Sequence, residues 1–148
     1  MIARVRYIAP NALCTQCEVD QRTIAAIGCC LGGLCVFDLT RSWTSVRSVV
    51  ALHGLLGAPG NTSDNKIRTE LLILHGNDDP MVAREDVLAI EKELSDAGAE
   101  CQLDTYGNTL HAFSNPSARN SAMGTVYNEN AERRSWASLI NFLRETLD

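Results

Sequence analysis

Long hydrophobic runs, clusters of positive charge and internal repeats are all missing from this chain of 148 residues. No apolar run approaches the roughly 20 residues that a membrane-spanning helix needs. Lys and Arg are scattered along the sequence, and 13 of them against 18 Asp and Glu leave a net charge of −5. We therefore expect no nucleic-acid partner and no membrane partner.

An export signal is not expected either. Arg4 and Arg6 lie near the N-terminus, but no long apolar stretch follows them, so the start does not resemble a signal peptide. The chain has six cysteines. In a protein that is not exported, these are expected to be free thiols in a reducing cytoplasm.

The spacing of the cysteines does not predict a metal site. Cys14 and Cys17 form one C-x-x-C, but neither a second C-x-x-C nor a closely spaced histidine pair completes a zinc site. The pair also lacks the preceding strand and following helix of a thioredoxin-like motif. A thiol-based redox or binding module that uses this pair together with Cys29 and Cys30 stays an alternative.

The apolar pattern predicts an α/β fold in one domain over residues 1–148. Short apolar runs predict four strands, at residues 24–27, 46–52, 70–75 and 101–106. Helical spacing of apolar residues predicts three helices, at residues 32–42, 87–97 and 128–147. Alternation of the two predicts a mainly parallel sheet of about four strands flanked by helices. Active sites of such sheets lie beyond the C-terminal ends of the strands.

Two expectations concern the C-terminal third. Residues 107–126 are polar and contain Gly and Pro, so we expect a long loop. Asn128 can cap the last helix. The apolar stripe of that helix is expected to comprise Trp136, Leu139, Ile140, Leu143 and Leu147.

Residues 28–32 read GCCLG, which is the cysteine form of a nucleophile elbow, G-x-C-x-G. A sharp turn from strand to helix strains the backbone of the nucleophile and leaves no room for a Cβ two residues to either side. Cys30 would stand at the positive end of a helix, which favours a thiolate, while Cys29 would point into the core. The backbone N–H of Leu31 could hold a developing oxyanion. The alternative is a glycine-rich turn around a buried cysteine.

An acid and a base follow later strands. Asp79 comes after the third predicted strand and His111 after the fourth, and the order nucleophile, acid, histidine is that of α/β-hydrolases. His111 would take the proton of Cys30 and later activate water. Asp79 would fix the tautomer of the imidazole. Asp78 is a rival acid, and a solvated turn or a lone loop histidine is the alternative for these residues.

Two further histidines are interpreted as packing residues. His53 and His75 each precede a glycine at the end of a predicted strand. Histidine in such a position packs more often than it takes part in catalysis. Neither is therefore assigned to the candidate site.

Four segments together carry a resemblance to a known family. They read RTIAAIGCCLGG at residues 22–33, LHGNDDPMV at 74–82, YGNTLHAF at 106–113 and AERRSW at 131–136. From about Val19 onward, the chain resembles the dienelactone hydrolase family of α/β-hydrolases. The resemblance implies Cys30 as nucleophile, Asp79 as acid and His111 as base. It also implies hydrolysis of an ester or lactone through a thioester, with neither metal nor organic cofactor.

The resemblance extends to the C-terminal half of the family fold. The N-terminal strands and the loop that carries the second oxyanion donor have no counterpart, and one substrate-binding arginine is absent. A short-chain carboxylic ester is therefore the expected small-molecule substrate. Residues 24–27, from Ile24 to Ile27, would form an apolar edge strand, which predicts a homodimer or swapped oligomer that covers it. Residues 1–17 could instead fold back and shield this edge. The alternative is a catalytically impaired fragment that acts as an assembly or binding module.

Overall fold

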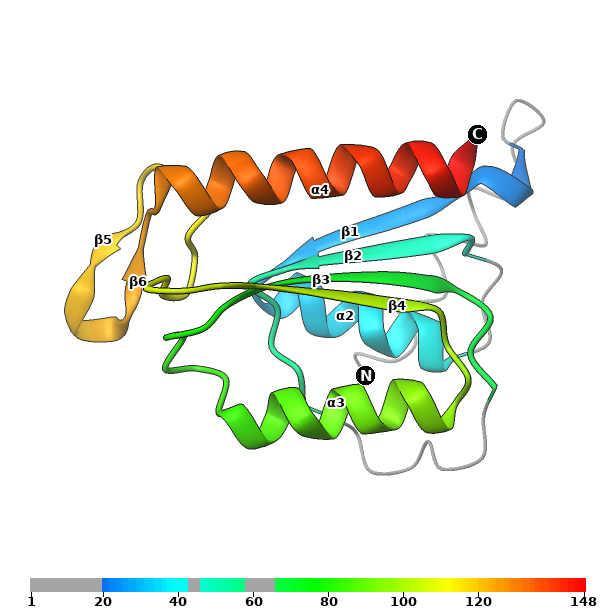
Figure 1. Cartoon of the computed structure of the whole chain (residues 1–148), viewed down its shortest axis with the longest axis horizontal. Helices are drawn as coiled ribbons and strands as arrows, with labels where there is room; N and C mark the ends of the chain where they lie inside the picture. The colour runs from blue at the N-terminus through cyan, green and yellow to red at the C-terminus, as the bar shows by residue number, and fades with distance from the viewer. Residues whose placement is uncertain (1–19, 43–45, 58–65) are drawn as a thin grey trace.

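A computed structural model describes residues 20–42, 46–57 and 66–148, and a parallel four-stranded sheet forms their centre (Figure 1). The strand order is β1-β2-β3-β4, with bounds Ala25–Cys29, Ser48–Leu52, Glu70–Gly76 and Cys101–Tyr106. Helices α2 (Leu31–Arg41) and α3 (Arg84–Asp96) cover one face, and α4 (Glu129–Leu147) covers the other. The predicted α/β fold is confirmed, and each predicted strand or helix agrees with the structure to within three residues at either end.

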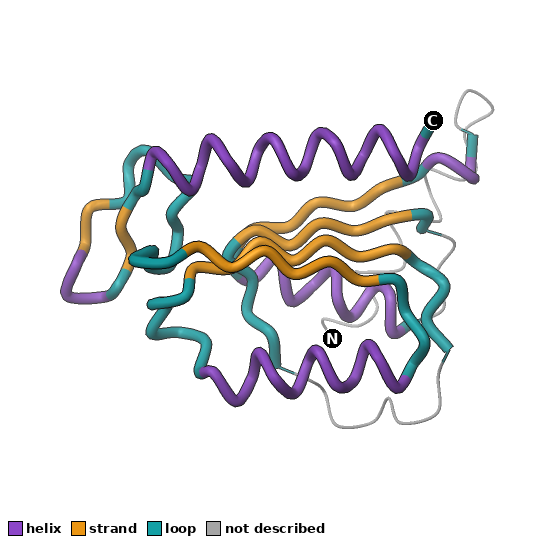
Figure 2. The backbone as a smooth tube through the Cα atoms, in the orientation of Figure 1, coloured by secondary structure: helices purple, strands orange, loops and turns teal. Residues whose placement is uncertain are grey.

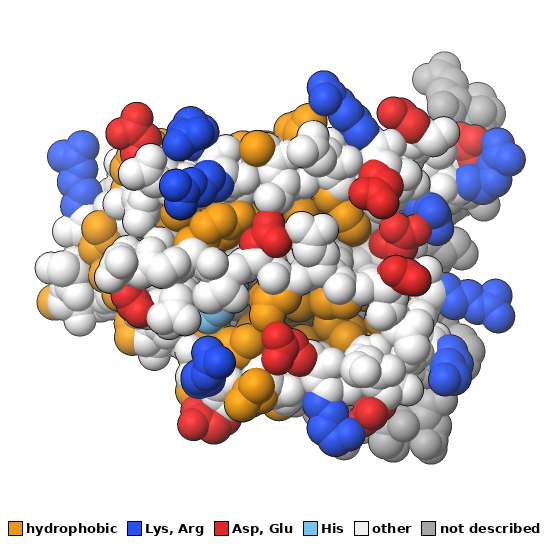
Figure 3. Space-filling view, viewed as in Figure 1, with side chains coloured by type: hydrophobic (Ala, Val, Ile, Leu, Met, Phe, Trp, Pro, Cys, Tyr) orange, Lys and Arg blue, Asp and Glu red, His pale blue; other side chains and the backbone are white. Residues whose placement is uncertain are grey.

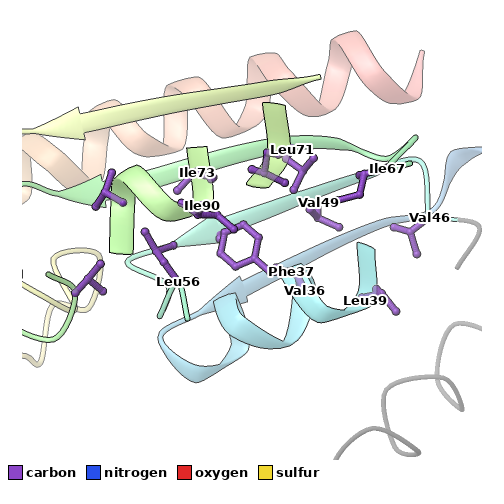
Figure 4. Packing of buried hydrophobic residues seen from close by; sticks show 14 residues of the cluster. Val36, Phe37, Leu39, Val46, Val49, Leu56, Ile67, Leu71, Ile73 and Ile90 are labelled. Atoms are coloured by element: carbon purple, nitrogen blue, oxygen red, sulfur yellow. The ribbon is translucent and has the colours of Figure 1, made fainter. Parts of the chain in front are cut away.

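Strands β2 and β3 are almost wholly buried because helices cover both of their faces. Alternate residues of each strand enter two separate clusters, as the period of two requires. Val49 and Ile73 pack with Phe37 of α2 and Ile90 of α3, as Figure 4 shows. On the opposite face, Val50, Leu52, Leu72 and Leu74 pack with side chains of α4.

Helix α4 begins where the sequence predicted. The side chain of Asn128 accepts a hydrogen bond from the N–H of Ala131 at 3.1 Å, which is a regular N-terminal cap. The predicted apolar stripe is partly wrong. Leu139 is buried, but Trp136 and Ile140 are 45% and 41% exposed.

Hydrogen bonds between polar side chains of α4 and the sheet go with an orientation of the helix that differs from the predicted one. The hydroxyl of Thr146 donates to that of Ser48 in β2 at 2.9 Å, and the hydroxyl of Ser138 donates to Asp104 in β4 at 2.6 Å. The buried face of α4 accordingly includes Thr146 and the small Ser135, together with Leu139 and Phe142. None of the helices that the structure describes is long and apolar enough to span a membrane.

The segment 107–126 is more structured than expected. Strands β5 (Arg119–Asn120) and β6 (Thr125–Val126) form a short antiparallel hairpin around the 3-10 helix η2 (Ser121–Met123). A second 3-10 helix, η1 (Gln21–Thr23), precedes β1. The hairpin lies beyond the C-terminal end of the large sheet, as Figure 2 shows. Its local hydrogen bonds involve polar side chains, which is why apolar periodicity did not reveal it.

The two outer strands of the described sheet are β1 and β4. Ile27 of β1 is 49% exposed, and Cys29 is exposed as well, so the expectation that Cys29 points into the core is wrong. Both side chains lie on the face of β1 opposite α2, and α4 packs on β2 and β3, so no described helix covers them. Apolar side chains also surface beside β4 (Figure 3). A hollow there is lined by Glu91, Leu94, Ser95, Ala99, Cys101 and Leu103.

Candidate active site

Cys30 lies in the turn between β1 and α2 and has a strained backbone. Its φ and ψ are 53° and −119°, a positive φ that non-glycine residues rarely adopt. Three hydrogen bonds hold this conformation. The N–H of Cys30 donates to the carbonyl of Leu52 at 3.2 Å, and its own carbonyl accepts from Gly33 at 3.0 Å and Leu55 at 3.2 Å. Such strain persists where surrounding structure over-determines it, as at functional sites.

The glycines of the motif have unequal roles. A Cβ on Gly28 would lie 2.1 Å from the carbonyl oxygen of Gly32, so Gly28 allows the chain to fold back on itself as predicted. The predicted need for glycine at position 32 is wrong, because a Cβ there meets no described atom within 4 Å. The restricted position is Gly33, where a Cβ would lie 2.4 Å from the Cα of Gly54.

Asp79 and His111 form a buried pair. Oδ2 of Asp79 lies 2.6 Å from Nδ1 of His111, and both side chains are almost inaccessible to solvent. Oδ1 of Asp79 accepts a second hydrogen bond, from the N–H of Met81 at 2.8 Å. Asp78 is exposed, and its carboxylate accepts from the side chain of Asn77 at 3.0 Å. Of the two candidate acids, the structure brings Asp79 to the histidine.

The loop that carries His111 leaves β4 at the edge of the sheet and crosses the end of β3. The N–H of Asp78 donates to the carbonyl of Thr109 at 3.0 Å. A Cβ on Gly76 would lie 2.5 Å from that same carbonyl oxygen, so glycine is required where the loop passes. Beyond the crossing, His111 exchanges backbone hydrogen bonds with Gly124 and Val126 of the hairpin segment, at 2.9 and 3.1 Å. The hairpin thus holds the backbone of His111 in place through these two hydrogen bonds.

The imidazole of His111 binds a proton more readily than usual. The hydrogen bond with Asp79 raises the pKa of His111, burial opposes this, and the side chain of Cys30 raises the pKa further. The thiol of Cys30 is therefore within interaction range of the imidazole. Nε2 of His111 makes no hydrogen bond of regular geometry to any described group. That nitrogen is thus available to take a proton from the thiol, as catalytic hydrogen bonds in ligand-free sites are often long.

Leu31 is the first residue of α2, so its N–H has no partner within the helix. It directly follows Cys30, where the positive end of the helix lies. This position suits the predicted role of the Leu31 N–H as a donor to an oxyanion. Among the described residues, no group of three or more His, Cys, Asp and Glu is arranged to hold a metal. Cys14 and Cys17 lie outside the described residues.

Sequence reasoning missed the contact of His53 with the site. Both His53 and His75 are buried, in agreement with packing. However, the ring of His53 also lies 5.1 Å from that of His111, and its Nε2 lies 2.9 Å from Oγ of Ser114. One signal was present in the sequence. His53 follows β2 just as Asp79 closely follows β3, which places both beyond the same end of the sheet.

Comparison with known proteins gives the family. Residues 3–147 match the model of the dienelactone hydrolase family. This chain belongs to the dienelactone hydrolase family. This family member is 33% identical to an uncharacterized protein of Caenorhabditis elegans, over 93% of this chain and 89% of that protein.

Solved structures similar to this family member include hydrolases. A crystal structure of a dienelactone hydrolase-like promiscuous phosphotriesterase from metagenomic libraries is 33% identical, with a TM-score of 0.88 over 99% of this chain. Esterase 2 of Thermogutta terrifontis shares the fold, at 17% identity and a TM-score of 0.71 over 97% of this chain. The family member spans 62% of the phosphotriesterase chain and 64% of the esterase chain.

Proposed function

We propose that this protein hydrolyses short-chain carboxylic esters or lactones, with Cys30 as nucleophile, His111 as base and Asp79 as orienting acid. The observation that carries the proposal is the strained Cys30 at the start of α2, within range of an imidazole that a buried carboxylate fixes at 2.6 Å. Membership in the dienelactone hydrolase family supports a hydrolase. A reducing compartment keeps exposed thiols such as Cys29 free, so we also propose that the reaction takes place in the cytoplasm.

Acylation begins when Nε2 of His111 takes the proton of the Cys30 thiol. Sγ then forms a bond to the carbonyl carbon of the ester, and the electron pair of the C=O moves to oxygen. The N–H of Leu31 donates to this oxyanion. As the carbonyl re-forms, the C–O bond to the alcohol breaks, and the alcohol leaves with the proton from His111. A thioester on Cys30 remains.

Deacylation repeats these steps with water. His111 takes a proton from water as the water oxygen bonds to the thioester carbon, and the C–S bond breaks when the carbonyl re-forms. Sγ recovers its proton from His111, and the carboxylic acid is released. The carboxylate of Asp79 stabilises the imidazolium that forms twice in each cycle. The raised pKa of His111 has the same cause.

The first test is hydrolysis of p-nitrophenyl acetate by the wild-type protein, Cys30→Ala and Cys29→Ala. Cys29 is a matched control because it is the adjacent thiol and is exposed. We expect Cys30→Ala to lose activity and Cys29→Ala to retain it, and mass spectrometry of the wild-type protein to show one acetyl group on Cys30. An aryl phosphotriester is a second substrate worth testing, given the activity of the metagenomic relative. Equal rates in wild type and Cys30→Ala contradict the proposal.

A second candidate is a catalytically impaired hydrolase that serves as an assembly or binding module. What favours it is that the N–H of Leu31 is the one oxyanion donor assigned among the described residues. Loss of one oxyanion donor lowers rates by about a hundred- to a thousandfold. Failure of the wild-type protein to hydrolyse any short ester above the buffer rate would favour this candidate.

For either candidate we propose that a second copy of the chain, as a homodimer or a swapped oligomer, covers the edge at β1. This edge has no strand partner among the described residues, and Ile27 in it is 49% exposed, so it can pair with its own copy. A two-fold axis would run the two edge strands antiparallel. Size-exclusion chromatography with light scattering at micromolar concentration should give a dimer. Ile27→Lys should give a monomer. A wild-type monomer contradicts this part of the proposal.

A further inference from the structure

His53 is held rigidly at the end of β2. It has a φ of 37°, a conformation that costs a non-glycine residue free energy, and its N–H donates to the carbonyl of Leu74 at 2.8 Å. The side chain is buried, with 4% of its surface exposed. Because β2 is an interior strand with a neighbour on each side, the backbone at His53 is held more firmly than the loop that carries His111.

One ring contacts three members of that loop. The ring of His53 lies 5.1 Å from that of His111 at an angle of 67°, and 5.3 Å from that of Phe113 at 81°. Both are edge-to-face contacts. Nε2 of His53 lies 2.9 Å from Oγ of Ser114. His53, which directly follows β2, therefore contacts the loop at the proposed base, His111, and at Ser114, three residues beyond it.

Asp79 alone does not fix the plane of the His111 ring. A single hydrogen bond at Nδ1 leaves the imidazole able to tilt about that bond, and a tilt moves Nε2 away from Cys30. A second contact on the ring removes this freedom. We propose that His53 and Ser114 form a positioning pair that sets the plane of His111 and thereby directs its Nε2 toward Cys30. This role rests on the function proposed above.

The charge state of His53 suits the role. Burial lowers the pKa of His53 to about 4, and the charge on His111 acts in the same direction, while Asp79 opposes both. His53 is therefore neutral at pH 7. A neutral ring neither repels the imidazolium of His111 nor competes with it for the carboxylate of Asp79. The Ser114 hydroxyl can donate or accept, so it serves either tautomer of His53.

Two substitutions at His53 distinguish the effect of its aromatic ring from the effect of its hydrogen bond with Ser114. His53→Phe keeps an aromatic ring against His111 and loses the bond to Ser114. His53→Gln keeps a polar atom near the place of Nε2 and loses the ring. Ser114→Ala removes the bond from the other side, Ser114→Thr restores a hydroxyl, and Ser117→Ala is a matched control at an exposed serine of the same loop.

The experiment combines steady-state ester hydrolysis with nuclear magnetic resonance titration of the histidines in the full chain. We expect His53→Phe, His53→Gln and Ser114→Ala to lower kcat about ten- to a hundredfold with KM nearly unchanged, because small misplacements of a catalytic group have effects of this size. The pKa of His111, now less firmly bonded to Asp79, should fall toward its ordinary value in each of the three. Ser114→Thr should recover most of the activity, and Ser117→Ala should match wild type.

The titration does not depend on turnover, so it separates this inference from the proposed function. A wild-type protein without esterase activity would refute the proposed function, and a shift of the His111 pKa in the His53 variants would still support the contact between the rings. An unchanged kcat together with an unchanged His111 titration in folded His53→Phe and Ser114→Ala would overturn the positioning role. If His53→Phe fails to fold, by circular dichroism, the comparison of Ser114→Ala with Ser114→Thr decides.

Discussion

Gly28 and Gly32 approach each other so closely that a methyl group on the Cα of Gly28 would lie 2.1 Å from the carbonyl oxygen of Gly32. Gly28→Ala must therefore push the start of α2 away from β1. We expect it to lower the free energy of unfolding by at least about 3 kcal/mol and to displace Cys30 enough to abolish esterase activity. Urea unfolding and ester hydrolysis measure the two effects.

Gly32→Ala is the matched control for this prediction. The same addition at Gly32 meets no described atom within 4 Å, and the residue lies inside a helix. Alanine is favoured over glycine in helices by up to about 1 kcal/mol, so stability should stay unchanged or rise. Similar losses in both variants would show that the close approach does not set the geometry of the turn.

The two neighbouring aspartates should respond very differently to the same substitution. Asp79→Asn keeps the shape of the side chain but removes the charge that orients and stabilises His111. We expect kcat to fall about a hundred- to ten-thousandfold. Asp78→Asn changes an exposed carboxylate and should leave kcat within about twofold. Comparable losses in the two variants would contradict the assignment of the acid.

Asn128 links α4 to the loop that carries His111. Its Oδ1 accepts from Ala131 at 3.1 Å, while its Nδ2 donates to Oγ1 of Thr109 at 3.0 Å. Asn128→Ala loses the cap and the link and should lower the free energy of unfolding by about 2 kcal/mol. Asn128→Asp keeps the acceptor and should lie between wild type and Asn128→Ala in thermal melting. An equal melting temperature for the two variants would mean that the cap contributes nothing.

Acid should destabilise the protein partly through His53. Since the pKa of this side chain is about 4 in the folded state and 6.5 ordinarily, the unfolded state binds the extra proton between these values. Stability from this group is present above pH 6.5 and is lost as pH falls toward 4. Between pH 7 and pH 5 the loss is about 2 kcal/mol. His75, whose pKa burial also lowers, acts in the same direction.

Urea unfolding of wild type and His53→Gln at pH 7 and pH 5 tests this pH dependence. The variant lacks the titrating group, so it should lose less stability than wild type on acidification. His111 has a raised pKa and acts with the opposite sign, because its contribution is lost as pH rises through the folded value. Because the pKa of His111 is expected to fall in His53→Gln, this contribution differs between the two proteins, and it is subtracted with the His111 pKa that titration gives for each before the losses are compared. Equal losses in the two proteins would contradict a buried neutral His53.

The sequence predicted the sheet well because β2 and β3 are buried on both faces. Wholly apolar runs such as residues 70–75 have few alternatives to an interior strand. The rotation of α4 was not predictable from apolar spacing. Hydrogen bonds from Thr146 to Ser48 and from Ser138 to Asp104 set it, and these join residues that lie 98 and 34 positions apart.

The candidate site was predictable to the extent that it is local. The elbow around Cys30 follows from five consecutive residues, and the structure has its strained backbone. The choice between Asp78 and Asp79 depends on which side of one turn faces His111, which spacing does not reveal. The contact of His53 with His111 depends on a loop that leaves β4 and crosses the end of the sheet, so only the folded chain shows it.

Cys30 and His111 follow the two outer strands of the described sheet, β1 and β4, whereas Asp79 and His53 come after interior strands. Outer strands open locally more often than inner ones, so their backbone amides exchange hydrogen with solvent faster. A ligand that is bonded to Cys30 and hydrogen-bonded to His111 would connect the residues that follow β1 and β4, the two outer strands. Amide exchange should then slow in β1 and β4 at the same time, including at the ends of these strands that are distant from the ligand, and stay unchanged in β2 and β3.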